Sequence, residues 1–262
     1  MLLLPFSWLY GFVLLLRHWL YDSGIFKSVK FSIPVIVIGN LSTGGTGKTP
    51  QTIYLAQLLK SYKPALLSRG YGRNSKGFRW VENDSLVTET GDEPLLFKQT
   101  LGETPIAVCE NRVAGIQKIL AERKPGVILL DDAYQHRQLV PGFSVLLIDF
   151  ASLQEPLYLL PAGNQRDLWS RRKKANVVVI TKCPITISNN EKNRLIDYIN
   201  QGCKNSLPVF FSHLKYGEVH RFSGEILAAD ELKNQSVILV TGIARPVSSA
   251  RPATGLFYQF VF

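Results

Sequence analysis

The sequence has little cysteine, and the cysteines it has are scattered. Three of its 262 residues are cysteines, Cys109, Cys183 and Cys203, and no two of them form a CxxC pair. This spacing argues against a disulfide framework and against a zinc site. We therefore expect free, buried thiols and a reducing compartment.

Acidic residues are also few relative to basic ones. The chain has 20 Asp and Glu against 30 Lys and Arg, which gives a net charge of +10. Such an excess favours a polyanionic partner, either nucleic acid, an anionic membrane surface or a phosphorylated substrate. Charge alone leaves that choice open. No internal repeat or low-complexity tract is present, and a hydrophobic content of 46% predicts a globular chain.

Charge is missing altogether from the apolar run at residues 2–16, "LLLPFSWLYGFVLLL". As a helix this run spans about 22 Å, which is less than the roughly 30 Å hydrocarbon core of a bilayer. No basic stretch precedes it and no small-residue cleavage site follows it, which argues against a secretory signal. We expect a helix lying in one leaflet, and the alternative is a buried helix of a soluble protein. The side chains suited to the interface and the headgroups are Trp8, Tyr10, Arg17, His18, Trp19 and Tyr21.

Short β-branched runs follow and alternate with helix-length segments. The runs are "PVIVIGN", "PALLSRG", "PIAVCEN", "GVILLDD", "FSVLLIDF", "ANVVVITK" and "LPVFFS". Runs that are apolar on both faces and alternate with helices predict an α/β fold with a doubly wound, mostly parallel sheet. The predicted domains are an N-terminal membrane-associated helix (1–30), a P-loop NTPase-like core (31–211), a hairpin linker (212–236) and an incomplete second α/β domain (237–262).

The first predicted strand leads into a glycine-rich stretch, "STGGTGKT". Its "GKT" ending matches a P-loop, in which backbone N–H groups surround phosphate oxygens, Lys48 neutralises them and Thr49 holds Mg²⁺. Ser42 stands where the strict pattern has glycine. The strand before and the helix after favour phosphate binding over an incidental glycine turn. The predicted phosphate-binding residues are Ser42, Thr43, Gly44, Gly45, Thr46, Gly47, Lys48 and Thr49.

A second strand delivers acidic residues. In "GVILLDDAYQH" the apolar residues 127–130 are followed by Asp131 and Asp132, at the carboxyl end of a strand, where α/β sheets bind ligands. We expect these acids to serve Mg²⁺ rather than to cap a helix. His136 has two interpretations, because it either reaches the same site or caps the next turn.

Other segments are ambiguous when considered singly. "TGDEP", with Asp92 and Glu93, has the composition of a solvated helix start. "LLSRGYGR" at residues 66–73 suits a loop near an anionic ligand, although its arginines also suit a plain surface. Lys182 stands where some nucleotide-binding folds stack a lysine on the base.

In their order along the chain, these motifs resemble the tetraacyldisaccharide 4'-kinases of lipid A synthesis. The resemblance rests on "GNLSTGGTGKTP", "LLSRGYGR", "GDEP", "ENRV", "DDAYQHR", "PAGNQRD" and "VTGIA", and covers nearly residues 1–244. It implies transfer of the γ-phosphate of MgATP to the 4'-hydroxyl of a lipid-anchored disaccharide 1-phosphate, which forms lipid IVA. It also implies a peripheral or monotopic protein at the cytoplasmic face of the bacterial inner membrane, facing an anionic membrane surface and no nucleic acid.

The same matching implies roles for individual residues. Asp92 acts on the attacking hydroxyl, and Lys48 and His136 are the other catalytic residues. Arg112 and Arg166 contact phosphate groups. The implied metal site consists of Thr49, Asp131, Asp132 and Asp167. Two positions depart from the family's usual residues, because Ala133 replaces a glycine and Asp167 replaces a glutamate.

The end of the chain departs further from the family pattern. Beyond "VTGIA" the family continues into a second α/β domain with a histidine-bearing segment, whereas this chain runs into "RPVSSARPATGLFYQFVF" and has no histidine after His220. Two alternatives to the active kinase follow: a catalytically impaired nucleotide-binding remnant, and a membrane-associated P-loop NTPase switch.

Overall fold

β-Branched and aliphatic residues form an eight-stranded sheet in the computed structural model, which describes residues 2–215, 219–220 and 226–227. The strand order is β3-β4-β2-β5-β1-β6-β7-β8. All neighbouring strands are parallel except β3 and β4. The strands are β1 (Val35–Asn40), β2 (Pro64–Ser68), β3 (Arg79–Trp80), β4 (Ile106–Val108), β5 (Val127–Leu130), β6 (Phe143–Asp149), β7 (Val177–Thr181) and β8 (Val209–Phe211). Each of the seven predicted runs forms a strand, and β3 is an antiparallel addition at the edge.

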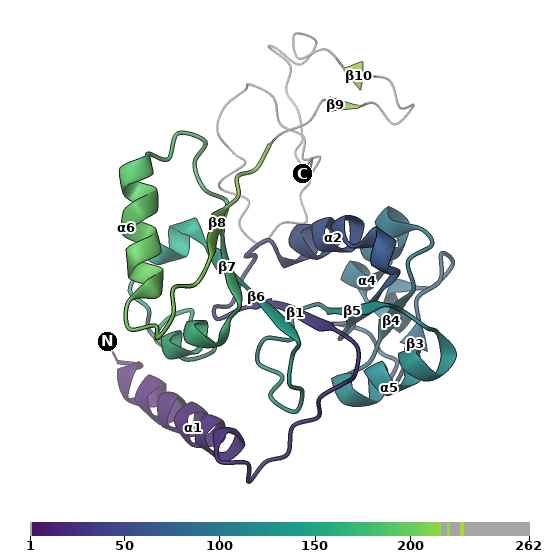
Figure 1. Cartoon of the computed structure of the whole chain (residues 1–262), viewed down its shortest axis with the longest axis horizontal. Helices are drawn as coiled ribbons and strands as arrows, with labels where there is room; N and C mark the ends of the chain where they lie inside the picture. The colour runs from purple at the N-terminus through teal and green to yellow at the C-terminus, as the bar shows by residue number, and fades with distance from the viewer. Residues whose placement is uncertain (1, 216–218, 221–225, 228–262) are drawn as a thin grey trace. The chain divides into compact units, whose positions relative to one another are not determined.

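Helices cover both faces of this sheet (Figure 1). The α-helices are α1 (Leu4–Asp22), α2 (Lys48–Leu58), α3 (Val87–Thr90), α4 (Asp92–Leu101), α5 (Arg112–Glu122) and α6 (Asn189–Asn200), and short 3-10 helices span Lys60–Tyr62, Phe150–Gln154 and Trp169–Lys174. One core cluster joins the strands to Ile53 of α2 and Phe97 of α4. The other joins them to Ile116 of α5 and Leu195 of α6. Side chains of β1, β2, β4, β5, β6 and β7 alternate between the two clusters, as the two-residue period of a strand requires. The doubly wound prediction is confirmed.

The carboxyl ends of β1, β5, β6 and β7 lie beside one another, because these strands are parallel neighbours in the sheet. They end in Asn40, Leu130, Asp149 and Thr181. The loop after β1 leads into α2, and the loop after β5 begins with Asp131. This edge is where open α/β sheets bind their ligands.

Two glycines begin helices at this edge. Gly47, with φ 78°, precedes α2, and Gly91, with φ 92°, precedes α4. Both angles lie in the region that favours glycine. A Cβ on Gly91 would come within 2.9 Å of the carbonyl oxygen of Tyr71, so the backbone approaches closely here. These two turns set where the first residues of α2 and α4 point.

α1 packs on the core through a narrow stripe. Its buried residues, Ser7, Gly11, Leu14 and His18, follow the helical period and include only one large apolar side chain. The predicted placement of His18 at lipid headgroups is wrong, because the imidazole is buried and bonded to Asp167. No helix in the described part of the chain is both long and apolar enough to cross a membrane.

The contacts divide the chain into two units, Met1–Ser212 and His213–Phe262, so α1 belongs to the same unit as the sheet. In the second unit β9 (Val219–His220) and β10 (Ile226–Leu227) form a short antiparallel pair within the predicted hairpin linker. The predicted second α/β domain at residues 237–262 lies outside the described residues.

Candidate active site

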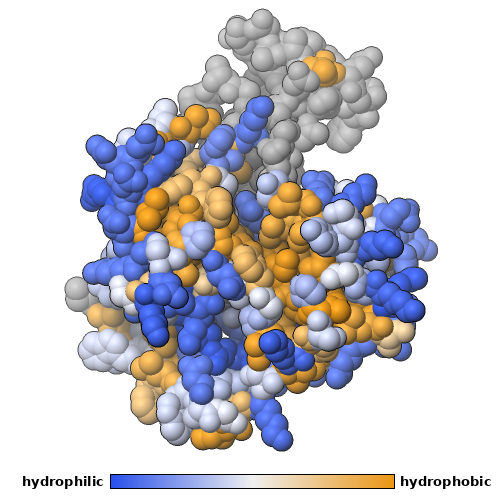
Figure 2. All heavy atoms as spheres, in the orientation of Figure 1, coloured by the Kyte–Doolittle hydropathy of each residue, from blue (hydrophilic) through white to orange (hydrophobic). Residues whose placement is uncertain are grey.

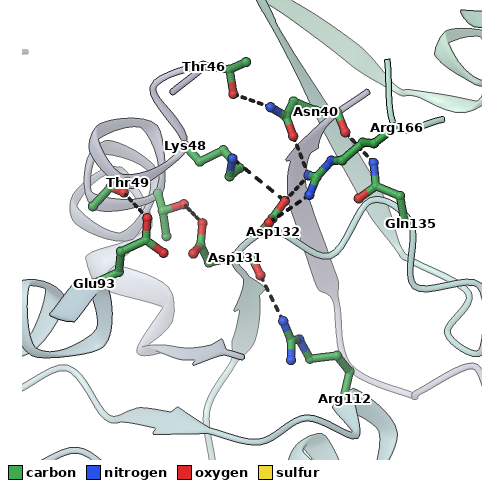
Figure 3. A network of polar contacts seen from close by, with 11 residues as sticks. Asn40, Thr46, Lys48, Thr49, Glu93, Arg112, Asp131, Asp132, Gln135 and Arg166 are labelled. Carbon is green, nitrogen blue, oxygen red and sulfur yellow. Dashed lines mark hydrogen bonds and ion pairs between the residues drawn. The ribbon is translucent and has the colours of Figure 1, made fainter. Parts of the chain in front are cut away.

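The glycine-rich loop between β1 and α2 is held from both sides. The Asn40 side-chain amide donates to the Thr46 hydroxyl at 2.8 Å (Figure 3). From β7 the Thr181 hydroxyl donates to the Thr46 carbonyl at 2.9 Å, and Lys182 donates to the Gly45 carbonyl. The Lys182 ammonium also pairs with Asp149 at 2.9 Å. The loop conformation is therefore fixed by residues at the ends of three strands.

Lys48 and Asp132 face each other across the strand ends. The Lys48 ammonium lies 4.0 Å from an Asp132 carboxylate oxygen. Asp132 has φ 45°, an uncommon conformation that persists only where the surrounding structure enforces it. Burial opposes ionisation of Asp132, but the hydrogen bond from Arg166 and the nearby cations hold its pKa below the ordinary value. Asp132 is thus an anion fixed beside the predicted phosphate-binding lysine.

Asp131 lies deeper than Asp132. Its carboxylate is fully buried and accepts a hydrogen bond from the Thr52 hydroxyl at 3.2 Å. Burial, together with the charges of Glu93 and Asp132, raises the pKa of Asp131 to about 7. Three acidic side chains are therefore crowded around Lys48 (Figure 3).

The "GDEP" motif places Glu93, rather than Asp92, against the loop. The Thr49 hydroxyl donates to a Glu93 carboxylate oxygen at 3.3 Å. Burial raises the pKa of Glu93, and the Lys48 charge partly opposes that rise. Asp92 is the exposed first residue of α4, and its carboxylate accepts from the Glu93 backbone N–H at 2.9 Å. Asp92 therefore lies at the rim, next to the residue that contacts Thr49.

The Thr49 hydroxyl and the nearby carboxylates fit a divalent cation of the Mg²⁺ type. Mg²⁺ takes only one or two carboxylates from a protein and completes its shell with phosphate oxygens and water. No cluster of three or more His, Cys, Asp or Glu side chains with metal-binding geometry occurs in the described residues. The Thr49 hydroxyl next to crowded carboxylates still suits a metal bound jointly with phosphate, because the negative charge that raises the pKa of Asp131 favours a cation.

Arg112 and His136 lie behind the acids. The Arg112 guanidinium is buried and donates to the carbonyls of Cys109, at 2.6 Å, and Asp131, at 3.4 Å. Burial lowers the pKa of Arg112 to about 10, so it remains cationic at neutral pH. Burial and the neighbouring charges of Arg112, Arg17 and Arg69 lower the pKa of His136 to about 4. Its imidazole is therefore neutral, and within the described part of the chain its buried Nε2 has no hydrogen-bond partner.

Arg166 and Asp167, the last two residues of "PAGNQRD", have different hydrogen-bond partners. Arg166 makes two hydrogen bonds to Asp132, one of them 3.1 Å long, and another to the Asn40 side-chain oxygen. Asp167 is almost fully buried, and its Oδ1 bonds the His18 imidazole at 2.7 Å. Within the described residues Asp167 makes no hydrogen bond or ion pair with Thr49, Asp131 or Asp132, so its predicted metal role has no geometric support.

Sequence reasoning missed several residues that build this site. They are Asn40, Thr52, Glu93, Gln135 and Thr181. A signal existed for Asn40 and Thr181, because each is a polar residue that ends an apolar strand. Glu93 was hidden by its resemblance to an ordinary acidic helix start, and Thr52 by its position one turn inside a helix.

Comparison with known proteins gives a consistent match. The family model described as tetraacyldisaccharide-1-P 4'-kinase (LpxK) matches residues 1–251. The tetraacyldisaccharide 4'-kinase of Flavobacterium johnsoniae is 43% identical over 247 residues, which cover 94% of this chain and 72% of that protein. The Flavobacterium psychrophilum enzyme of the same name is 44% identical over 252 residues, with the same coverage of both chains. The structure of LpxK from Aquifex aeolicus in complex with ATP superposes with a TM-score of 0.72 at 34% identity, covering 90% of this chain and 71% of that one.

Proposed function

Because the chain belongs to the tetraacyldisaccharide 4'-kinase family, we propose how the residues of its site divide the work of phosphorylating the lipid A precursor. The reaction transfers a phosphoryl group from ATP to the 4'-hydroxyl of a tetraacyldisaccharide 1-phosphate. The observation that carries the assignment of residues is the glycine-rich loop and Lys48 facing Asp131, Asp132 and Glu93.

The phosphate groups of ATP are held by the loop and the start of α2. Backbone N–H groups at the start of a helix bind anions, and Lys48 adds a positive charge at the same point. Phosphoryl transfer depends mainly on positioning and on neutralising charge, since the protein does little covalent chemistry. Asn40 and Thr181 contribute by fixing the Thr46 segment of the loop.

Mg²⁺, when bound with ATP, neutralises charge that develops on the phosphate oxygens. We assign its protein ligands to Thr49 and to one or two of the acids around Lys48, which are Glu93, Asp131 and Asp132. Arg166 keeps Asp132 ionised and oriented toward Lys48. Arg112 remains a candidate phosphate contact because it stays cationic beside Asp131.

Asp92 is the proposed acceptor-side residue. Its carboxylate is exposed, and it lies one residue from Glu93, so it borders the site from the solvent side. A carboxylate in that position can accept the proton of a sugar hydroxyl or orient that hydroxyl. His136, neutral at pH 7, is assigned to hydrogen bonding rather than to carrying charge.

α1 is the proposed membrane contact. The helix turns a small, partly polar stripe inward and large apolar side chains outward, which is the reverse of a helix in a soluble domain. Apolar and weakly polar side chains lie at the surface in the lower left of Figure 2, where α1 is drawn in Figure 1. The exposed side chains include Phe6, Trp8, Leu9, Phe12, Val13, Leu15, Leu16 and Trp19. We propose that they enter one leaflet at the cytoplasmic face of the inner membrane, where the acylated substrate resides.

The test measures ADP formed by the full chain with MgATP, with and without tetraacyldisaccharide 1-phosphate in detergent micelles. The kinase assignment requires that ADP formation depend on the acceptor and that Lys48→Ala abolish it. Equal ADP formation without acceptor would instead indicate an NTPase switch. MgATP binding without any ADP would indicate a nucleotide-binding remnant.

A further inference from the structure

We propose that α1, besides contacting the membrane, is part of the ATP site, with Tyr10 and His18 acting as positioning residues for Arg166. The proposal rests on the nucleotide site assigned above. It concerns the bridging segment, defined as residues 159–167, which lies between α1 and the glycine-rich loop. Three sets of contacts carry it.

The first set joins α1 to the bridging segment. The Ser7 hydroxyl donates to the Leu159 carbonyl at 2.9 Å and accepts from the Ala162 N–H at 3.0 Å. The Tyr10 hydroxyl donates to the Arg166 carbonyl at 2.8 Å. A Cβ on Gly11 would come within 2.9 Å of the Leu159 side chain, so helix and segment are in close contact. α1 is thus attached to this segment by specific hydrogen bonds rather than by apolar packing alone.

The second set joins the bridging segment to the glycine-rich loop. The backbone N–H groups of Arg166 and Asp167 both donate to the Leu41 carbonyl, at 2.8 and 3.2 Å. The Thr43 N–H donates to the Asn164 carbonyl at 2.7 Å. Movement of the segment would therefore move the first residues of the loop.

The third set joins Arg166 to the site itself. Its guanidinium bonds both Asp132, which faces Lys48, and Asn40, which holds Thr46 (Figure 3). Arg166 thereby fixes both the residue that faces Lys48 and the residue that holds Thr46. Its backbone is held by Tyr10 and Leu41, which fixes the point from which the side chain reaches these partners.

The His18–Asp167 pair locks this arrangement in place. Both side chains are almost fully buried, at 7% and 1% exposed, and are joined at 2.7 Å. Burying two such groups is expensive unless they are paired, so the pair fixes the register of α1 on the segment more strictly than apolar contacts would. Removal of His18 leaves the buried Asp167 carboxylate without this partner. Because Asp167 is the neighbour of Arg166, any rearrangement that restores a partner to Asp167 also displaces Arg166.

A parallel route supports the same conclusion. The Arg17 guanidinium donates to the Gln135 carbonyl at 2.9 Å, and the Gln135 side chain donates to the Asn40 carbonyl. α1 is therefore connected to Asn40 from two directions. A helix that served only to hold the protein at a membrane would not need either connection.

The experiment compares His18→Leu and Tyr10→Phe with the unmodified full chain, in detergent so that membrane binding is not limiting. We expect kcat/KM for ATP to fall roughly 10- to 100-fold in His18→Leu, the range for small misplacements in an active site. His18→Gln, which retains an N–H donor, should recover part of the loss. In an Arg166→Gln background, His18→Leu should change kcat/KM less than about twofold, because its effect passes through Arg166.

The matched control is Asp22→Asn. Asp22 joins α1 to Arg137 at 2.6 Å, and among the described residues it makes no hydrogen bond or ion pair with the bridging segment. It should leave the ATP parameters unchanged. Unchanged kinetics in His18→Leu and Tyr10→Phe, or an equal loss with and without Arg166, would overturn the proposal. Thermal unfolding verifies that each variant is folded. If His18→Leu does not fold, Tyr10→Phe still tests the proposal, because it removes only one hydroxyl.

Hydrogen exchange separates this inference from the assigned activity. His18→Leu should speed hydrogen exchange at the amides of Thr43, Arg166 and Asp167, because their hydrogen bonds connect the bridging segment to the chain at the start of the glycine-rich loop. Unchanged exchange there would contradict the proposal even in a chain without activity. Absence of MgATP turnover in the unmodified chain, with the exchange change present, would count against the assigned function alone.

Discussion

Asn40 ties the end of β1 to several other parts of the site. Its amide nitrogen holds Thr46, its side-chain oxygen accepts from Arg166, and its carbonyl accepts from Gln135. The three partners come from different loops. Loss of Asn40 would therefore remove contacts from the glycine-rich loop, from Arg166, which holds Asp132, and from the turn after β5. The site therefore depends on residues that do not themselves carry charge.

Asp92 and Glu93 are adjacent but should behave differently when changed. Asp92→Asn should leave MgATP affinity nearly intact and lower transfer by roughly 10²- to 10⁴-fold, as expected for loss of a general base. The amide oxygen of asparagine can still accept from the Glu93 N–H, so the helix start is preserved. Glu93→Gln should instead raise the Mg²⁺ concentration needed for half-maximal rate, because Glu93 contacts Thr49.

Steady-state kinetics over a range of Mg²⁺ and acceptor concentrations separates these two effects. Equal transfer by Asp92→Asn and by the unmodified chain would return Asp92 to the role of a helix start.

His136 should make stability depend on pH. Its pKa is lowered to about 4 in the folded chain, whereas an unfolded histidine has about 6.5. Below pH 6.5 the unfolded chain therefore binds more protons, and stability falls as pH drops toward 4. Between pH 7 and pH 5 we expect a loss of about 1–2 kcal/mol in the free energy of unfolding that His136→Gln removes. Urea unfolding of both chains at the two pH values measures it, and an equal pH dependence would contradict the prediction.

At the scale of elements, α1 has two faces with different partners. Its inner stripe bonds the bridging segment, whereas its outer surface carries large exposed apolar side chains. A helix of 19 residues with this distribution is typical of an interfacial helix rather than of a core helix. The two faces place the ATP site at a fixed distance from whatever surface the outer face contacts.

Polar substitutions on the outer face should weaken membrane binding. We expect Trp8→Ser and Phe12→Ser each to reduce binding to anionic phospholipid vesicles by roughly 10- to 150-fold, since each removes about 1.5–3 kcal/mol of apolar burial. Leu58→Ser is the control, because Leu58 is equally exposed but lies on α2. Vesicle cosedimentation gives the comparison. Unchanged binding in the α1 variants, or an equal loss in Leu58→Ser, would contradict a specific role for α1.

The elements were more predictable than the contacts between them. The seven runs from "PVIVIGN" to "LPVFFS" all form strands, because buried parallel strands have continuous apolar sequences. β3 escaped prediction because a two-residue edge strand has no periodicity to detect. The pairing of His18 with Asp167 also escaped it, because 149 residues separate them and only the folded chain brings them together.

The site residues also divide into those that a local sequence pattern predicts and those that only the folded chain brings together. The loop, Lys48 and the Asp131–Asp132 pair follow from local motifs, because a strand and a helix fix their direction. Glu93 contacts Thr49 only because α4 packs against α2, and Arg166 contacts Asp132 only because the bridging segment meets the loop after β5. No local pattern encodes either meeting.

For the molecule as a whole, the central claim is that one site at the carboxyl edge of the sheet uses ATP to phosphorylate a lipid acceptor. The net charge of +10 suits a substrate that already carries a phosphate. In our proposal, Lys48, Thr49 and the three acids supply the groups that phosphoryl transfer requires. We propose that α1 links that chemistry to the membrane surface.

The most direct test is the identity of the product. The full chain is incubated with MgATP and tetraacyldisaccharide 1-phosphate, and the recovered lipid is examined by phosphorus NMR and mass spectrometry. The account predicts one added phosphomonoester, attached at the 4' position, with the unmodified chain and none with Lys48→Ala. Unchanged acceptor alongside free inorganic phosphate, or an equal yield of product from Lys48→Ala, would contradict it.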